Sequence, residues 1–237
     1  MIRHSGTLVR MAALGATLAG SSTIAAQPAV LDAGTFTITG GTQVLGREQF
    51  SVVRAPPGAA WSLELRVDAA RGDSLVAFRL QVDSSGRPVN ARRESRTAGR
   101  VVARATGAQS RGRFATLWRD GQHEAAREHR LARGTVLLDP SVVHAALLAV
   151  QALARDSVAG VVTLDGRPTA VLKRVAAGVN DSLRIGGRWL DARRTDALWA
   201  GNALRLWTDT AGRLLAVDGL RTGERALRDD PPESGPR

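Results

Sequence analysis

Apolar and polar residues alternate along most of this chain, and that period of two is typical of half-buried β-strands. In the clearest run Trp61, Leu63, Leu65 and Val67 share one face, with Ser62, Glu64, Arg66 and Asp68 on the other, and Phe78, Leu80 and Val82 repeat the pattern. Asp-Gly and Gly-Gly pairs, which supply the positive φ of tight hairpin turns, follow several such runs, at 120–121, 165–166 and 186–187. The pattern predicts roughly ten strands joined mainly by hairpins, in an antiparallel meander.

One segment departs from the alternation and favours a helix. Asp139-Pro140-Ser141 is a typical helix start, with Asp as the N-cap and Pro at the first helical position. Residues 142–153 are almost wholly apolar, so a helix at about 140–154 must be largely buried. The predicted fold class is therefore mainly β (β-rich α+β): a strongly curved antiparallel meander sheet, or half-barrel, wrapped around this one helix.

Residues 122–133 fit two structures. Glu124 and Glu128 stand at helical spacing, whereas the Asp120-Gly121 turn before them favours a returning strand. We predict a strand.

The N-terminus has the features of a secretory signal peptide. Arg3 and Arg10 are basic, residues 11–19 are apolar, and Ala25-Ala26 provides a small-residue cleavage site. The predicted domains are a signal peptide at 1–26, one half-barrel domain at 27–220, and a polar, Pro-rich disordered tail at 221–237. This organisation predicts a bacterial periplasmic or secreted protein without a transmembrane segment after cleavage.

Composition excludes several function classes. The chain has no cysteine, which excludes disulfides, thiol catalysis, Cys-ligated metals and attachment as a lipoprotein. The formal net charge is +11, but the arginines are scattered among strand positions and aromatic residues are few. We therefore expect no nucleic-acid binding, and an anionic envelope component such as lipid or polysaccharide is the expected charged partner. The oligomeric state is left open.

No catalytic motif is complete. The run from His123 to Arg127 is close to the zinc-protease motif H-E-x-x-H, but Arg127 occupies the place of the second His. We predict no metal, no cofactor and no catalytic residues. A hydrolase that uses His144 or His123 is the least favoured alternative.

Two short motifs carry a resemblance. Residues 41–50 (GTQVLGREQF) resemble the "G-x-x-V-G-x-E-x-F" opening hairpin of uncharacterised bacterial envelope domains of unknown function. Residues 204–215 (LRLWTDTAGRLL) resemble their closing hairpin, "W-x-D-x-x-G-R-L-L". These families are in turn similar to the half-barrels of LolA/LolB-type lipoprotein carriers. The resemblance implies a fold and a compartment, and no catalytic residue.

An apolar helix facing a sheet with large side chains predicts a groove for a lipid or another hydrophobic ligand, and hence an exported, non-enzymatic binding protein. The alternatives are that helix and sheet pack without a cavity, and that the protein is an envelope interaction or assembly module with no small ligand. The residues predicted to line the groove are Trp61, Phe78, His144, Leu148, Gln151 and Trp207.

Overall fold

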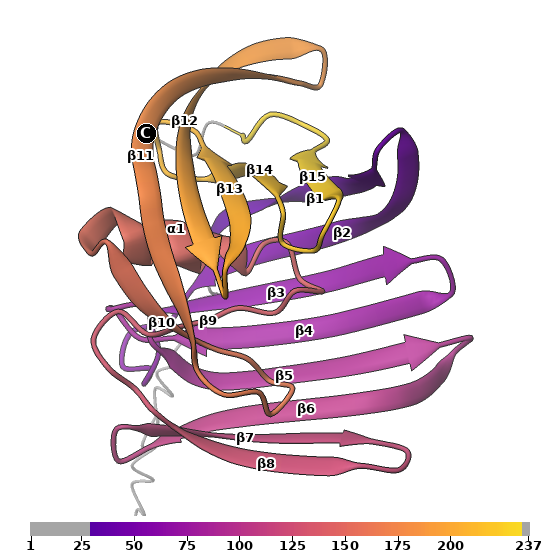
Figure 1. The fold of residues 1–237 in the computed structure, drawn as a ribbon, viewed down its shortest axis with the longest axis vertical. Helices are drawn as coiled ribbons and strands as arrows, with labels where there is room; N and C mark the ends of the chain where they lie inside the picture. Colours follow the sequence, from indigo (N-terminus) through magenta and orange to yellow (C-terminus); the bar gives the residue numbers. More distant parts are fainter. Residues whose placement is uncertain (1–28, 234–237) are drawn as a thin grey trace, which may run out of the picture.

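A single curved sheet of fifteen strands makes up most of the protein (Figure 1). The computed structural model describes residues 29–233, so the predicted signal peptide at 1–26 lies outside the described residues. The strand order is β8-β7-β6-β5-β4-β3-β2-β1-β15-β14-β13-β12-β11-β10-β9. Neighbouring strands are antiparallel except β9 and β10, which are parallel. The mainly-β class with a curved antiparallel sheet and one helix is therefore confirmed.

The strands fall into two series along the chain. The first runs β1 (Val30–Gly40), β2 (Gln43–Arg54), β3 (Leu63–Arg71), β4 (Ser74–Val82), β5 (Pro88–Thr97), β6 (Arg100–Ser110), β7 (Arg113–Asp120) and β8 (Glu124–Arg130). The second runs β9 (Val136–Leu137), the helix α1 (Ala146–Arg155), β10 (Val158–Val162), β11 (Ala170–Ile185), β12 (Arg188–Trp199), β13 (Asn202–Thr208), β14 (Leu214–Asp218) and β15 (Glu224–Arg228).

The first series is a regular meander of hairpins. Alternate residues such as Phe50, Phe78 and Phe114 point into the main core and are almost fully buried. The ambiguous segment 122–133 contains strand β8, as predicted, which pairs along β7. Local alternation and turn chemistry were sufficient here because each strand pairs with its neighbour in the chain.

Side chains hold the edge strand β8 against the loop that follows β10. Arg127 Nε donates a hydrogen bond to the Gly166 carbonyl at 2.8 Å, and His129 Nδ1 lies 3.0 Å from Thr169 Oγ1. These contacts link β8, at one end of the sheet, to a loop beside the other end without a backbone ladder, so the curved sheet has a barrel-like form.

The helix is shorter than predicted. It begins at Ala146, whereas Asp139 and Pro140 begin a turn in which Asp139 Oδ1 accepts the Ser141 N–H at 2.9 Å. The chain between this turn and the helix is held by the buried Glu48, whose carboxylate accepts the N–H groups of Val143 and His144 at 2.6 and 2.7 Å. A carboxylate from a distant strand therefore holds the segment that leads into the helix, and the helix itself has no side-chain cap.

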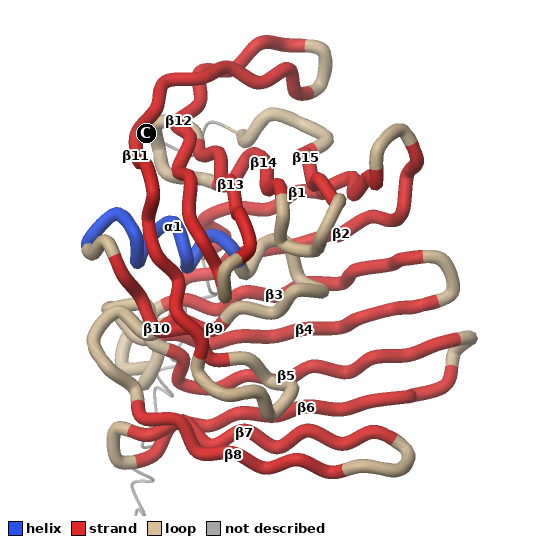
Figure 2. Tube along the Cα trace, viewed as in Figure 1, coloured by secondary structure: helices blue, strands red, loops and turns tan. Residues whose placement is uncertain are grey.

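The helix packs inside the curve of the sheet, with β11 and β12 passing in front of it in the view of Figure 2. Its most buried residues are Ala146, Leu148, Ala149, Ala152 and Leu153. Within the described chain no helix has the length and apolarity needed to cross a membrane.

The long β11–β12 hairpin bends away from the main core. Its register shifts between Arg174 and Val179, close to Gly178, whose φ is +71°. The far half of the hairpin covers a second, smaller apolar cluster, formed by Leu183, Ile185, Ala192, Trp207, Leu215 and Ala216.

The prediction of a disordered tail from residue 221 is wrong for the part that the structure describes. Strand β15 lies within the sheet and pairs with both β1 and β14. Its inward positions are Ala226 and Arg228, which are 4% and 3% exposed. The segment resembles a polar tail in sequence because one of its inward residues, Arg228, is charged. The burial of Arg228 depends on its pairing with Asp32, which is distant in the sequence.

Candidate functional site

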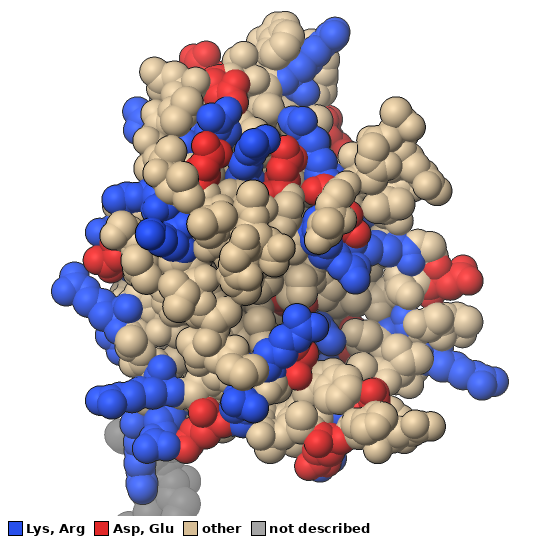
Figure 3. All heavy atoms as spheres, viewed as in Figure 1, with Lys and Arg blue, Asp and Glu red and all other residues tan. Residues whose placement is uncertain are grey.

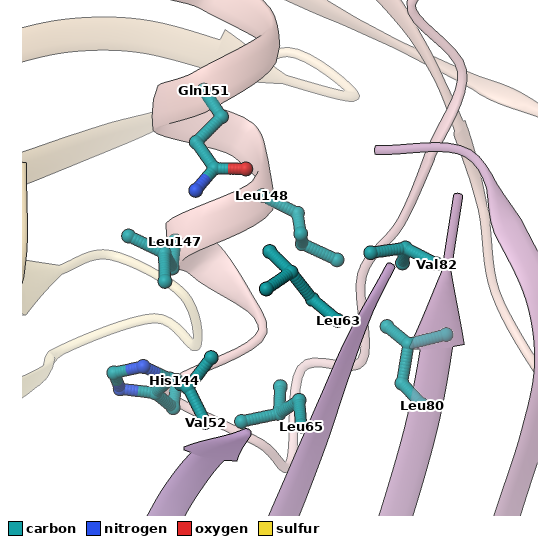
Figure 4. Close-up of a pocket in the computed structure, with 9 residues that line it drawn as sticks. All are labelled: Val52, Leu63, Leu65, Leu80, Val82, His144, Leu147, Leu148 and Gln151. Carbon is teal, nitrogen blue, oxygen red and sulfur yellow. The ribbon is translucent and has the colours of Figure 1, made fainter. Parts of the chain in front are cut away.

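A narrow apolar slot lies between α1 and strands β2, β3 and β4 (Figure 4). Its walls are Val52, Leu63, Leu65, Leu80, Val82, His144, Leu147, Leu148 and Gln151. The slot holds about 20 Å³ of free space, which is room for about one water molecule. In this conformation the helix and the sheet are therefore packed closely together.

The slot adjoins a wider hollow at the end of the barrel where α1 ends. This hollow, which we call the mouth, has a volume of about 470 Å³, within the range of small-molecule sites. Leu63 and Gln151 line both spaces. The other residues that shape the mouth include Arg54, Pro56, Trp61, Asp83 and Arg155.

The charge at the mouth favours an anionic group. Arg54 and Arg155 line it, and Arg155 Nη1 is held by the Ser85 carbonyl at 2.6 Å. Burial alone would raise the pKa of Asp83, but hydrogen bonds from the Ser85 hydroxyl and from the backbone N–H groups of Arg87 and Ser85 hold that pKa below its usual value. The Asp83 carboxylate is thus committed to its own turn, which leaves Arg54 and the remaining N–H donors of Arg155 for a ligand.

His144 sits at the inner end of the slot and is fully buried. Its ring stacks on Phe50 with centroids 3.7 Å apart, and neither ring nitrogen has a hydrogen-bond partner among the described residues. Figure 4 shows the nitrogen-bearing edge turned away from Val52 and Leu65. Burial, with a smaller contribution from Arg228, lowers the pKa of His144 to about 3, so the ring is neutral at physiological pH.

The structure brings together four of the six predicted site residues. His144, Leu148 and Gln151 line the slot, and Trp61 lines the adjoining mouth. Phe78 is 1% exposed in the main core and does not line the slot.

The prediction for Trp207 is wrong. Its indole belongs to the second apolar cluster, under the bent β11–β12 hairpin, and its Nε1–H donates to Asp181 Oδ2 at 2.8 Å. The alternation along β13 does not reveal that this strand packs against two separate cores.

His123, the other histidine considered for catalysis, lies on the exposed β7–β8 turn with its Nδ1 3.3 Å from Asp120 Oδ1. The described residues contain no group of three or more His, Cys, Asp or Glu side chains that could hold a metal ion. Figure 3 shows basic and acidic side chains intermingled over the visible face.

Sequence reasoning missed the polar groups inside the barrel, namely Glu48, Asp32 and Arg228. A signal for the first was present, because Glu48 has the same strand parity as Phe50 and Val52 and so must point inward. Arg228 has the same relation to Ala226. A charged residue on the apolar face of a strand indicates a buried partner elsewhere in the fold.

No protein-family model and no curated protein matches the chain. Among solved structures it is similar to a β-barrel-like protein of the domain of unknown function DUF1849 from Brucella abortus. That similarity has a TM-score of 0.48 and 11% sequence identity, and it covers 85% of this chain and 98% of the other.

Proposed function

We propose that this is an exported, non-enzymatic protein that binds an amphiphile with an apolar chain and an anionic head. The observation that carries the proposal is that the apolar slot and the arginine-flanked mouth lie next to each other and share Leu63 and Gln151 as lining residues. An apolar chain would enter along α1, while the head would remain beside Arg54 and Arg155.

The dimensions set how such a ligand sits. The mouth is large enough for a head group and the first carbons of a chain, with Trp61 as an apolar wall. The slot behind it holds about 20 Å³, so deeper entry requires side chains of α1 such as Leu148 to move. We therefore expect weak binding of short chains and a conformational step for long ones.

Two further arguments support the proposal. The predicted signal peptide and the resemblance to LolA/LolB-type carriers both favour an envelope protein that handles hydrophobic cargo. His144 is neutral and its ring nitrogens have no partner among the described residues, so it lacks the paired acid or nucleophile of a hydrolase.

Three probes that share a dodecyl chain and differ in the charge of the head group test the proposal: dodecanoate, dodecanol and dodecylamine. Their binding to the purified protein is measured by calorimetry. We expect dodecanoate to bind most tightly, and Trp61→Ala to weaken it by about tenfold. Trp189→Ala is the matched control, because Trp189 is 71% exposed and lies far along the chain on β12. Equal affinity for all three head groups, or equal loss in both variants, would overturn the proposed site.

Export has its own test. Mass spectrometry of the protein from the bacterial envelope fraction should give a mass that lacks residues 1–26. A full-length protein found in the cytoplasm would overturn this part of the proposal.

A further inference from the structure

A second hollow lies at the opposite end of the barrel from the mouth. Leu63 pairs with Val82 at the mouth end of β3 and β4, whereas Arg71 pairs with Ser74 at the other end. Ser74 lines the second hollow, which has a volume of about 540 Å³. We call it the arginine hollow, because Arg93, Arg96, Arg167 and Arg221 line it and Asp165 is the one acid among its lining residues. The guanidinium group of Arg96 itself is held by Glu94, which does not line the hollow.

Three of these arginines are anchored. Arg93 pairs with Asp139 at 2.8 Å, Arg96 with Glu94 at 2.8 Å, and Arg167 with Asp165 at 3.0 Å. A guanidinium has five N–H donors and a carboxylate accepts two of them at most side by side, so each pair leaves donors unused. Arg221 makes no ion pair or side-chain hydrogen bond with any described residue.

Burial and chain topology make this more than a surface cluster. The Arg93 side chain is only 15% exposed, and the buried Asp139, 1% exposed, fixes it at the wall of the hollow. The four arginines come from three separate segments: β5, the loop between β10 and β11, and the turn between β14 and β15. The fold therefore brings residues as far apart in sequence as 93 and 221 to the arginine hollow.

We propose that the arginine hollow binds a small sugar-sized molecule that carries a phosphate or carboxylate group. The anionic oxygens would accept N–H donors from Arg167 and Arg221 at the rim and from Arg93 at the wall. The hydroxyl groups of Ser95 and Thr97 and the partly buried ring of Trp118 also line the hollow and suit a polyhydroxylated ring. This site is separate from the amphiphile site, and either proposal can fail without the other.

Titration of the full chain with inorganic phosphate, glucuronate and uncharged glucose, at low salt, tests the site. We expect phosphate and glucuronate to bind, to weaken as salt rises, and to shift the indole N–H signal of Trp118 in NMR spectra but not that of Trp61. Phosphate binding alone would assign the site to phosphorylated ligands, and glucuronate binding alone to sugar acids. Both results support the proposal.

The double variant Arg167→Ser/Arg221→Ser should weaken binding by about tenfold or more. Both side chains are exposed, so the fold should tolerate the change. The matched control is Arg130→Ser/Arg188→Ser, which removes the same charge from exposed positions outside the hollow. Glucose binding as tightly as glucuronate, no binding of either anion, or equal loss in the control would overturn the proposal.

Discussion

Asp32 and Glu48 are two carboxylates with little exposure to solvent, and they are satisfied in different ways. Asp32 forms a two-pronged pair with Arg228, at 3.0 and 2.9 Å, which joins β1 to β15 across 196 residues of sequence. Glu48 forms no ion pair with any residue in the described part of the chain, and it accepts two backbone N–H groups at the entry to α1. Phe50 lies between the two sites, with Arg228 5.2 Å from its ring centre and His144 stacked on it.

The carboxyl groups of Asp32 and Glu48 are stabilised by different partners. In the Asp32–Arg228 pair each charge faces its counter-ion, and Arg228 also donates to the carbonyls of Ala33 and Asp230. Around Glu48 burial dominates over the two N–H bonds and raises its pKa to about 8. Asp32 therefore belongs to a buried ion pair, whereas Glu48 is a single buried carboxyl group whose protonation changes near physiological pH.

Removing one partner of the buried ion pair should have the largest effect. Asp32→Ala leaves Arg228 charged and buried, and we expect the free energy of unfolding to fall by about 3–5 kcal/mol. Urea denaturation followed by tryptophan fluorescence measures this loss. Asp68→Ala, at an exposed carboxylate on β3, is the control and should change the value by less than about 0.5 kcal/mol. A loss as small as the control's would mean that Arg228 finds water or another partner.

Glu48→Ala should have a smaller effect. It leaves the N–H groups of Val143 and His144 buried without an acceptor, at about 1–3 kcal/mol for each group, but it also relieves the burial of a carboxyl. We expect a net loss of about 2 kcal/mol, and faster hydrogen exchange at residues 143–148 than in the rest of the core. Unchanged exchange there would contradict the role of Glu48 in holding the segment before the helix.

The pH dependence of stability should distinguish the two sites. The pKa of Glu48 rises from 4.5 to about 8 on folding, so its contribution is complete below pH 4.5 and is lost as the pH rises towards 8. The pKa of His144 falls from 6.5 to about 3, so its contribution is complete above pH 6.5 and is lost as the pH falls towards 3. The two slopes oppose each other between pH 4.5 and 6.5.

We therefore expect a plateau from pH 4.5 to 6.5 and a decline between pH 6.5 and 8 of up to about 1.4 kcal/mol per pH unit. Denaturation at half-unit pH intervals measures the profile. Glu48→Gln should abolish the decline above pH 6.5, because the amide does not titrate. A decline that persists in this variant would assign the effect to another group.

The smallest effect should come from replacing the whole ion pair. Asp32→Leu combined with Arg228→Met removes both charges and keeps apolar volume, and we expect the free energy of unfolding to change by less than about 1 kcal/mol. A thermal melt of the double variant beside each single variant forms the cycle. A loss as large as that of Asp32→Ala would show that the pair contributes more than mutual neutralisation.

The predictable parts of the fold were those in which sequence neighbours are also neighbours in space. Strands from β1 to β8 follow from alternation and hairpin turns, and even the ambiguous β8 was placed correctly. The helix start and the tail were misplaced because their partners, Glu48 for the entry to α1 and Asp32 for Arg228, are about 95 and 196 residues away. The same holds in the candidate site. Leu148 and Gln151 were placed correctly because one helix positions both, whereas Trp207 was misplaced because its environment depends on a bent hairpin.

By itself the sequence determined the strand-rich class, the presence of a buried apolar helix and the apolar character of its side chains, because these depend on local periodicity and turn chemistry. Only the tertiary structure decided how tightly the helix packs on the sheet at the slot, that the slot lies beside the mouth, and which buried charges are paired. These properties depend on side chains that converge from distant strands, and local sequence patterns do not specify the distances between them.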